Sequence, residues 1–225
     1  MHHDTSQPGD NRSVKTALVD DHIVLREGLA AVINDFTGYK VMIRAGNGSE
    51  LIEQLRPKNL PDIVLLDLNM PVMNGCDTVQ WLKKNYPEVR IVIFTMFDSE
   101  PLHLQLLRLG VRGVVKKDVH PNELNYAMDK VMKGEYYCSQ FIADEEGSAY
   151  APQLKQPAQP VAFSEKEIEF MKWSVSDLTY KKIADKMHVS EHTVKNYWTS
   201  LKEKLGIRSR VALAMYAVEK GIIHI

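Results

Sequence analysis

The chain has 225 residues, of which 44% are hydrophobic and 25% charged, and its formal net charge at pH 7 is −1. This composition supplies enough apolar surface to bury cores, so it excludes a chain that is disordered throughout, and the length suits one large domain or two modest ones. The charge is uneven: residues 162–225 hold eleven Lys and Arg against eight Asp and Glu, a net +3, which leaves −4 for the rest. An acidic front and a mildly basic back suggest different partners, although +3 alone is weak support for nucleic acid.

The front of the chain alternates short β-branched runs with longer amphipathic stretches, after a polar start at residues 1–13 that we predict to be a disordered tail. This rhythm of βα units implies a parallel sheet covered on both faces. The predicted strands are Thr16 to Val19, Lys40 to Arg44, Ile63 to Leu66, Ile91 to Phe94 and Gly113 to Val115. The predicted helices are Ile23 to Asn34, Ser49 to Leu55, Cys76 to Asn85, Pro101 to Leu109 and Pro121 to Lys133. These elements make a complete doubly wound α/β domain, which we place at residues 14–138.

Residues 139–160 hold several Pro and Gln, a Gly-Ser pair and few aliphatic side chains, which predicts a linker that cannot bury enough surface to offset chain entropy. Beyond it the pattern is purely helical. Ser164 and Glu167 have the spacing of a capping box, Thr179 and Ser190 are placed to cap the next two helices, and Gly206 to end the third. Short helices with tight connections predict a small all-α helix-turn-helix domain at residues 161–225.

The sequence also indicates the cellular location of the protein. No apolar run approaches the roughly 18 residues needed to span a bilayer, and the polar start lacks the apolar stretch of a secretory signal. We therefore expect a cytoplasmic protein without membrane contact. Its two cysteines, Cys76 and Cys138, have neither metal-ligand spacing nor the density of a secreted scaffold, so we expect two free thiols.

Three carboxylates follow predicted strands directly: Asp20 and Asp21 after the first and Asp67 after the third. In a doubly wound sheet, ligands bind beyond the carboxyl ends of the strands, and the three carboxylates converge there if these two strands are neighbours. Like charges so close repel each other unless a cation neutralises them, and Mg²⁺ prefers carboxylate and phosphate oxygens. The alternative is that each Asp only caps the helix after its strand, which fits one such residue better than three.

Four motifs around these carboxylates resemble the signature stretches of two-component receiver domains. They are LVDDH at 18–22, LLDLNMPVMNG at 65–75, FTMFD at 94–98 and GVRGVVKKD at 110–118. The resemblance implies a flavodoxin-like sheet with strand order 2-1-3-4-5. It also implies that Asp67 accepts a phosphoryl group from a histidine kinase and that Thr95 donates its hydroxyl to the aspartyl phosphate. The Mg²⁺ that phosphoryl transfer requires would be held by Asp20, Asp21, Asp67 and the backbone carbonyl of Asn69.

A lysine after the fifth strand would pair with the same phosphoryl group. The chain offers two, and the spacing from Gly110 and Gly113 favours Lys117, with Lys116 as the runner-up. Strand alternation lets only one of them face the site. Val114 stands where many receivers carry an aromatic switch residue, so coupling by burial of a ring is in doubt.

The stretch from Thr179 to Arg210 resembles the helix-turn-helix of LuxR-type regulators, with KKIADKM, VSEHTVKNY and KLGIRSR as its best-matching pieces. Together with the receiver it points to the NarL/FixJ subfamily, in which the closing helix, here Val211 to Ile223, pairs two DNA-bound subunits. The residues support this independently, because the predicted helix from Glu191 to Leu205 has one apolar stripe, made of Val194, Trp198, Leu201 and Leu205. Trp198 is therefore expected in the core.

The opposite face of that helix and its surroundings supply the candidate DNA contacts. For an arbitrary amphipathic helix such a face is simply solvated, but after a helix-turn-helix pattern with nearby cations a DNA-binding face is favoured. The candidates are Lys181, Lys182, His192, Thr193, Lys195, Asn196, Thr199, Lys202 and Arg208, with Lys204 and Arg210 as further candidate phosphate contacts.

These observations predict a transcriptional regulator of a two-component system that is phosphorylated at Asp67 and binds paired DNA half-sites as a dimer. Apart from its own phosphoryl transfer and dephosphorylation, we expect no enzymatic activity. An aspartyl-phosphate phosphatase on a related α/β fold is one alternative, but such enzymes carry a second Asp two residues after the nucleophile, where this chain has Asn69. A degenerate receiver that serves only as an interaction module is the other, and the intact set of Asp20, Asp21, Asp67, Thr95 and a lysine argues against it.

Overall fold

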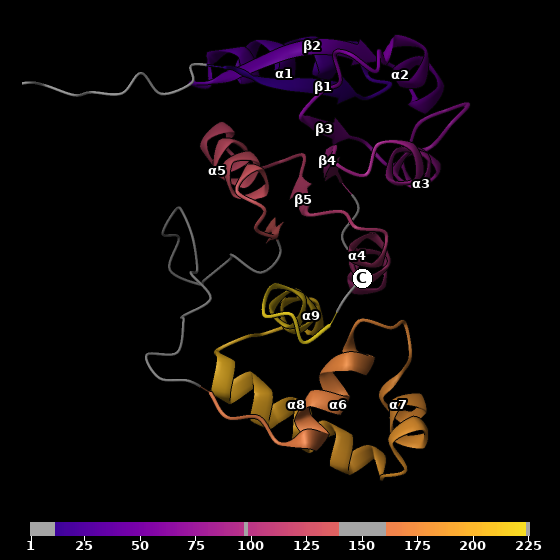
Figure 1. The fold of residues 1–225 in the computed structure, drawn as a ribbon, viewed down its shortest axis with the longest axis vertical. Helices are drawn as coiled ribbons and strands as arrows, with labels where there is room; N and C mark the ends of the chain where they lie inside the picture. The colour runs from indigo at the N-terminus through magenta and orange to yellow at the C-terminus, as the bar shows by residue number, and fades with distance from the viewer. Residues whose placement is uncertain (1–11, 97–98, 140–160, 224–225) are drawn as a thin grey trace, which may run out of the picture.

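The structure is a computed structural model that describes residues 12–96, 99–139 and 161–223. It has two parts, an α/β domain and a helical domain, which meet along one helix from each (Figure 1). The predicted tail at 1–13 and linker at 139–160 fall almost wholly outside the described residues. Both cysteines are free, as predicted. In the described part of the chain, no helix is long and apolar enough to cross a membrane.

The α/β domain is built on a parallel sheet with strand order β2-β1-β3-β4-β5-β6. The strands are β1 (Val14–Val19), β2 (Tyr39–Ala45), β3 (Ile63–Leu66), β4 (Arg90–Thr95), β5 (Gly113–Lys116) and β6 (Tyr137–Cys138). The predicted order is confirmed, with β6 as an added edge strand. A strand of two residues is too short to show alternation, which is why the sequence pattern did not predict it.

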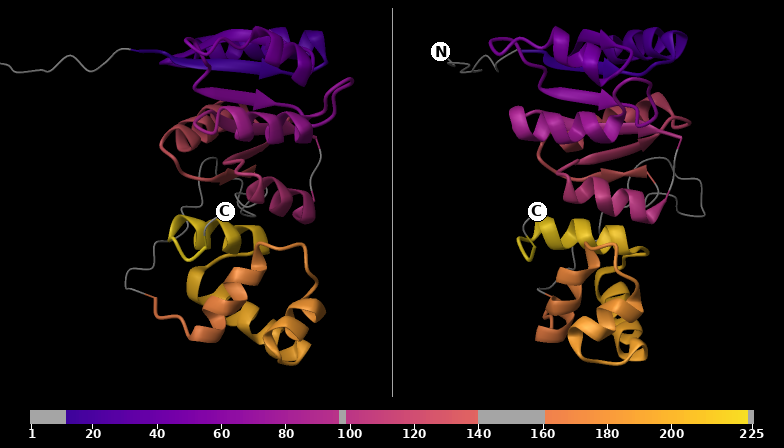
Figure 2. Two further views of the ribbon diagram at one scale, coloured as in Figure 1. Left: turned by 45° about the vertical axis from the view of Figure 1, so that its right-hand side comes forward. Right: turned by 90° about the vertical axis from the view of Figure 1, so that its right-hand side faces the viewer.

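Five helices cover the two faces of this sheet (Figure 2). They are α1 (Ile23–Asp35), α2 (Gly48–Gln54), α3 (Gly75–Asn85), α4 (Glu100–Arg108) and α5 (Pro121–Met132). Alternate strand residues enter opposite cores: Ala17 and Val19 pack with α2, α3 and α4, whereas Leu18 packs with α1 and α5. Both faces are buried, so the central strands appear in the sequence as continuous apolar runs.

The helical domain consists of α6 (Glu165–Ser174), α7 (Tyr180–Met187), α8 (Glu191–Leu205) and α9 (Arg210–Glu219). The predicted caps are confirmed: the capping box forms at Ser164, hydroxyls cap α7 and α8, and Gly206 ends α8 with a left-handed φ of 64°. The predicted closing helix was too long. It ends at Glu219, because Gly221 adopts a φ of 67° that helix geometry does not allow.

The two domains share a small apolar cluster between α4 and α9 (Figures 1 and 2). Leu104 and Leu107 of α4 pack there with Val211 and Ala214 of α9 and with Val175. Two polar contacts flank the cluster: Arg108 to Asp177 at 3.5 Å, and the Tyr136 amide, which donates to Glu219 at 3.2 Å. The sequence did not predict which helices make this contact.

Candidate functional site

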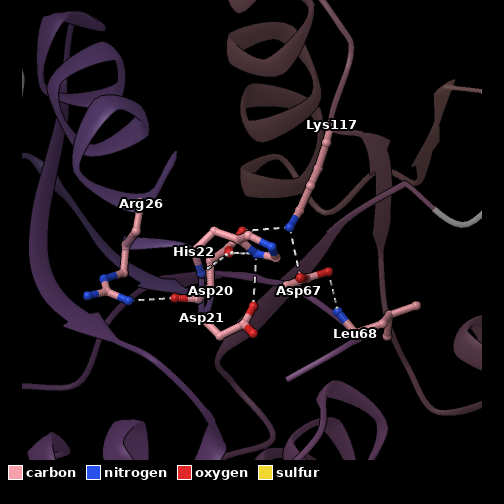
Figure 3. A network of polar contacts seen from close by, with 7 residues as sticks. All are labelled: Asp20, Asp21, His22, Arg26, Asp67, Leu68 and Lys117. Atoms are coloured by element: carbon pink, nitrogen blue, oxygen red, sulfur yellow. Dashed lines mark hydrogen bonds and ion pairs between the residues drawn. The ribbon is translucent and has the colours of Figure 1, made fainter. Parts of the chain in front are cut away.

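The three predicted carboxylates converge at the carboxyl edge of the sheet (Figure 3). β1 and β3 are paired neighbours whose last residues are register partners, so Asp20 and Asp67, each next in the chain, emerge side by side. They are 4% and 5% exposed. Ligand atoms of Asp20, Asp21, Asp67 and His22 all lie within 4.8 Å of one another. Parallel pairing therefore brings Asp67 next to Asp20 and Asp21, which lie 47 and 46 positions earlier, as the order of the strands predicts.

Lys117 contacts two of the three carboxylates in this pocket. Its Nζ lies 2.7 Å from Asp20 Oδ2 and 2.7 Å from Asp67 Oδ2, and its side chain is 8% exposed. Burial acts to lower the pKa of Lys117, but hydrogen bonds to the two carboxylates outweigh it and raise the pKa. Lys116, the runner-up, is the last residue of β5, and its amide donates to Ser139. The lysine in the pocket is therefore Lys117, as the spacing favoured.

Backbone contacts fix the orientation of Asp67. Its amide donates to the Val19 carbonyl at 2.8 Å, and its Oδ1 accepts from the Leu68 amide at 2.8 Å. Gly75, at the start of α3, packs against the same turn, and a Cβ there would lie 2.4 Å from the Asp67 carbonyl oxygen. A larger residue at this position would have to displace the backbone of the turn.

Two further residues, which the sequence analysis did not single out, contact the pocket. Arg26 of α1 donates to the Asp20 carbonyl at 2.6 Å and holds the turn after β1. The His22 ring lies 3.1 Å from Asp20 Oδ1 and 2.9 Å from Asp21 Oδ1. The only sequence signal for either was proximity to the Asp pair, because a side chain that folds back onto its own turn leaves no periodic pattern.

The structure also locates the other predicted site residues. Thr95 is the buried last residue of β4, beside β3, and its carbonyl accepts from the Lys117 amide at 3.1 Å. Asn69 is exposed in the loop that follows Asp67. Val114, which stands where many receivers carry an aromatic residue, packs half-buried against the core that contains α2, α3 and α4.

The residues of the pocket fit a hard divalent cation. Three carboxylates supply oxygen ligands, the kind that Mg²⁺ prefers, and Lys117 cannot balance three negative charges alone. Among the polar groups of the described residues, Asp21 Oδ1 contacts only the His22 ring, and an imidazole can be displaced by a cation.

Exposed apolar side chains surround the pocket. Val24 and Val72 are 89% and 88% exposed, and Ile23 and Met96 are also largely exposed. Ile23 and Val24 begin α1, Val72 lies in the loop after β3, and Met96 follows β4, so all four stand at the edge of the sheet that carries Asp67. Val72 has a φ of 68°, which is unusual for a β-branched residue.

The second predicted site lies on α8. Its apolar stripe is confirmed, because Val194, Leu201 and Leu205 are buried and Trp198 packs half-buried against the domain core. Eight of the nine candidate contacts are exposed, and the ninth, Thr193, is half-buried near its cap residue Ser190; the exposed ones are Lys181, Lys182, His192, Lys195, Asn196, Thr199, Lys202 and Arg208. The N-terminal half of α8 thus offers a polar and cationic face.

One of the two further phosphate candidates, Arg210, is wrong. Arg210 is buried and donates to four main-chain carbonyls at the end of α6 and in the loop after it. Lys204 pairs with Glu167, 2.7 Å away, and ties α8 to α6. Burial opposes the charge of Glu167, but Lys204, Ser164 and Ser200 donate to its carboxylate and lower its pKa to about 2. Both cations stabilise the domain, and the exposed Lys204 stays a candidate phosphate contact.

An acidic pocket at the carboxyl edge of a doubly wound sheet, followed by a helix-turn-helix, is the arrangement of a receiver domain joined to a DNA-binding module. Comparison with known families agrees. The response regulator receiver domain matches residues 16–129, and the luxR family of bacterial regulatory proteins matches residues 161–217. The chain belongs to the two-component response regulators that carry a LuxR-type DNA-binding domain.

Similar proteins cover nearly the whole chain. The transcriptional regulatory protein YdfI of Bacillus subtilis (strain 168) is 32% identical over 211 residues, 94% of this chain and 98% of YdfI. The response regulator GacA of Pseudomonas syringae pv. syringae (strain B728a) is 30% identical, over 93% of this chain and 98% of GacA. The crystal structure of a LuxR-family response regulator from Aurantimonas sp. SI85-9A1 has 31% identity and a TM-score of 0.53, over 56% of this chain and 89% of that one.

Proposed function

We propose that the protein is a DNA-binding transcriptional regulator that is switched by phosphorylation of Asp67. The observation that carries the proposal is the buried acidic pocket in which Lys117 Nζ lies 2.7 Å from both Asp20 and Asp67. An Asp67 oxygen attacks the phosphorus of a phosphohistidine donor, and the bond from phosphorus to the donor nitrogen breaks. Lys117 then pairs with the phosphoryl oxygens, and the Thr95 hydroxyl donates to one of them.

Asp20, Asp21, Asp67 and the Asn69 carbonyl would hold Mg²⁺. When bound there, the ion supplies charge neutralisation and orientation of the phosphoryl oxygens. Asp20 and Asp21 also keep the pocket anionic before phosphorylation, which favours retention of a divalent cation. The proposal includes no reaction beyond transfer to Asp67 and loss of the phosphoryl group.

The donor is a histidine kinase, in this proposal, and it docks on the apolar surface made of Ile23, Val24, Val72 and Met96. Such large side chains at high exposure around a reactive group indicate a surface that a protein covers. The approach brings the phosphohistidine to the mouth of the pocket between α1 and the loop after β3.

The α8 face binds the major groove of DNA. His192, Lys195 and Asn196 at its N-terminal half would contact base edges or phosphates, and Lys181, Lys182 and Arg208 would contact the backbone. Lys195 pairs with Glu191 at 2.8 Å, an exposed pair that a phosphate can replace at small cost.

Phosphorylation reaches DNA binding through the contact between α4 and α9. Thr95 ends β4 and α4 begins shortly after it, so a shift of Thr95 toward a phosphoryl group is transmitted to the α4 surface that covers α9. Release of α9 lets two subunits pair, and tethered helix-turn-helix domains then bind the second half-site at a high effective concentration. The unphosphorylated protein is held closed and monomeric.

The experiment is intact-mass spectrometry after incubation with a small-molecule phosphodonor and Mg²⁺. We expect one labile adduct on the wild type and none on Asp67→Asn, which keeps the shape of the side chain but lacks the nucleophile. An undiminished adduct on Asp67→Asn would place the acceptor elsewhere.

A further inference from the structure

The edge of the sheet opposite Asp67 carries a cleft with a volume of about 310 Å³. It lies at the amino ends of β1, β3 and β4, between the loops that precede β3 and β4. Six of its lining residues are charged, four cationic and two acidic: Arg12, Lys15, Lys58, Arg90, Asp62 and Glu88. It is separate from the phosphoryl-acceptor pocket, since parallel strands run from one edge to the other.

One of the two carboxylates is already engaged by the fold. Asp62 Oδ2 accepts from the Lys15 amide at 2.8 Å, and Oδ1 lies 3.7 Å from Arg12. The Asp62 backbone pairs with both neighbours, donating to the Lys15 carbonyl at 2.8 Å and accepting from the Arg90 amide at 3.1 Å. Asp62 therefore links the amino ends of β1, β3 and β4. Its carboxylate contacts the Lys15 amide and Arg12, and does not form an ion pair with the other cations of the cleft.

The remaining cations exceed the remaining acid. Lys15 Nζ donates to the neutral Asn59 amide oxygen at 2.7 Å. Among the described residues, no carboxylate forms an ion pair with Lys58 or Arg90 within 4.0 Å. Glu88 is the one acidic lining residue left, against Lys15, Lys58 and Arg90. The cleft thus has a surplus of positive charge within a part of the chain that is acidic overall.

The pKa of a neighbouring lysine shows the same excess of positive charge. Lys83 donates to the Val89 carbonyl at 3.2 Å, next to the start of β4. Burial lowers the pKa of Lys83, and the charges of Arg112 and Arg90 lower it further, against a smaller opposing effect of Glu88. Cations that repel one another at a single edge are stabilised when an anion binds among them.

We propose that this cleft binds a small anion that carries phosphate groups. Lysine and arginine together offer the point charge and the planar fork that phosphate oxygens accept, and the volume suits a small molecule. Pro57, Leu60 and Pro61 give the cleft an apolar wall against which an organic group attached to the phosphate can pack. The ligand class is thus inorganic diphosphate or an organic phosphate such as a nucleoside diphosphate.

Calorimetric titration of the full chain tests whether the cleft binds phosphate. EDTA is present, so that no metal ion at the Asp67 pocket can bind the phosphate instead. Pyrophosphate and ADP are the probes, at constant ionic strength. We expect saturable one-to-one binding, with the same affinity in Asp67→Asn as in the wild type. In the double variant Lys58→Gln with Arg90→Gln, the affinity should fall by about tenfold for each of the two cations removed. The control, Lys133→Gln with Lys172→Gln, removes the same charge from exposed positions that do not line the cleft and should leave binding unchanged.

The two probes separate the sources of the phosphate. Tighter binding of ADP assigns an organic phosphate, and equal binding assigns inorganic diphosphate; either outcome supports the site. An independent readout needs no variant, because bound anion should raise the pKa of Lys83 in the wild type, measured by NMR. Absence of saturable binding, or an equal loss in the control variant, overturns the proposal.

Discussion

Replacement of Leu107 by alanine should separate the two domains of the unphosphorylated protein. Leu107 is buried in the cluster shared by α4 and α9, whereas its neighbour Leu106 is buried in the core of the receiver domain. Leu→Ala at buried sites costs about 2–5 kcal/mol, and the lower figure suits a small cluster that can partly collapse. A loss of about 2 kcal/mol shifts the balance between closed and open arrangements by about thirtyfold toward open.

Loss of the neighbouring ion pair should shift the balance between closed and open arrangements less than loss of the Leu107 side chain. Arg108 and Asp177 lie 3.5 Å apart with side chains 36% and 70% exposed, so their pairing contributes at most about 1 kcal/mol. Arg108→Ala should therefore shift the same balance by about fivefold or less. The comparison of the two variants decides whether apolar packing or the ion pair holds the domains together.

The assay is small-angle X-ray scattering of the unphosphorylated protein, together with its affinity for an operator selected in vitro. Leu107→Ala should expand the protein and raise operator affinity without phosphorylation. Leu106→Ala, the matched control, should lower the stability of the receiver domain and leave both measurements near wild type. Equal behaviour of the two variants, or no expansion in Leu107→Ala, would refute the role given to the α4 and α9 contact.

Three further predictions concern single residues. Glu167 has a folded pKa of about 2, below its ordinary 4.5, so its contribution of up to about 3 kcal/mol is present above pH 4.5 and lost as the pH falls toward 2. In urea unfolding, the gap between wild type and Glu167→Gln should close over that range, and a gap independent of pH would contradict the ion pair with Lys204. Lys195→Ala should weaken DNA binding without unfolding the domain; a phosphate contact predicts that the salt slope falls by about 1, and unchanged affinity for operator and random DNA would remove Lys195 from the interface. Gly75→Ala should cost about 1–3 kcal/mol and slow formation of the adduct, because its Cβ would lie 2.4 Å from the Asp67 carbonyl; wild-type stability and rate would show that the turn adapts.

Local patterns predicted most of the fold because they reflect burial directly. Short β-branched runs located β1 to β5, and the cap residues Ser164, Thr179 and Ser190 located helix starts in the helical domain. The Asp cluster was predictable because the order of parallel strands brings Asp20 and Asp67 to one edge. These are properties of near neighbours or of topology.

What the sequence did not predict depends on where a side chain ends up in three dimensions. Arg210 was a candidate phosphate contact, but it is buried among carbonyls, and charge alone does not reveal burial. Leu104 and Leu107 fitted an ordinary core helix, and nothing in the sequence showed that α9 would cover them. Arg26 reaches back to a backbone carbonyl, a contact with no sequence signature.

The central claim is that phosphorylation of Asp67 increases DNA binding. Operator affinity should be measured by fluorescence anisotropy for the wild type and for Asp67→Asn, each with and without phosphodonor in the presence of Mg²⁺. The account predicts a rise of about tenfold or more for the wild type on phosphorylation and none for Asp67→Asn. Equal affinity of the phosphorylated and unphosphorylated wild type, or the same rise in Asp67→Asn, would contradict it.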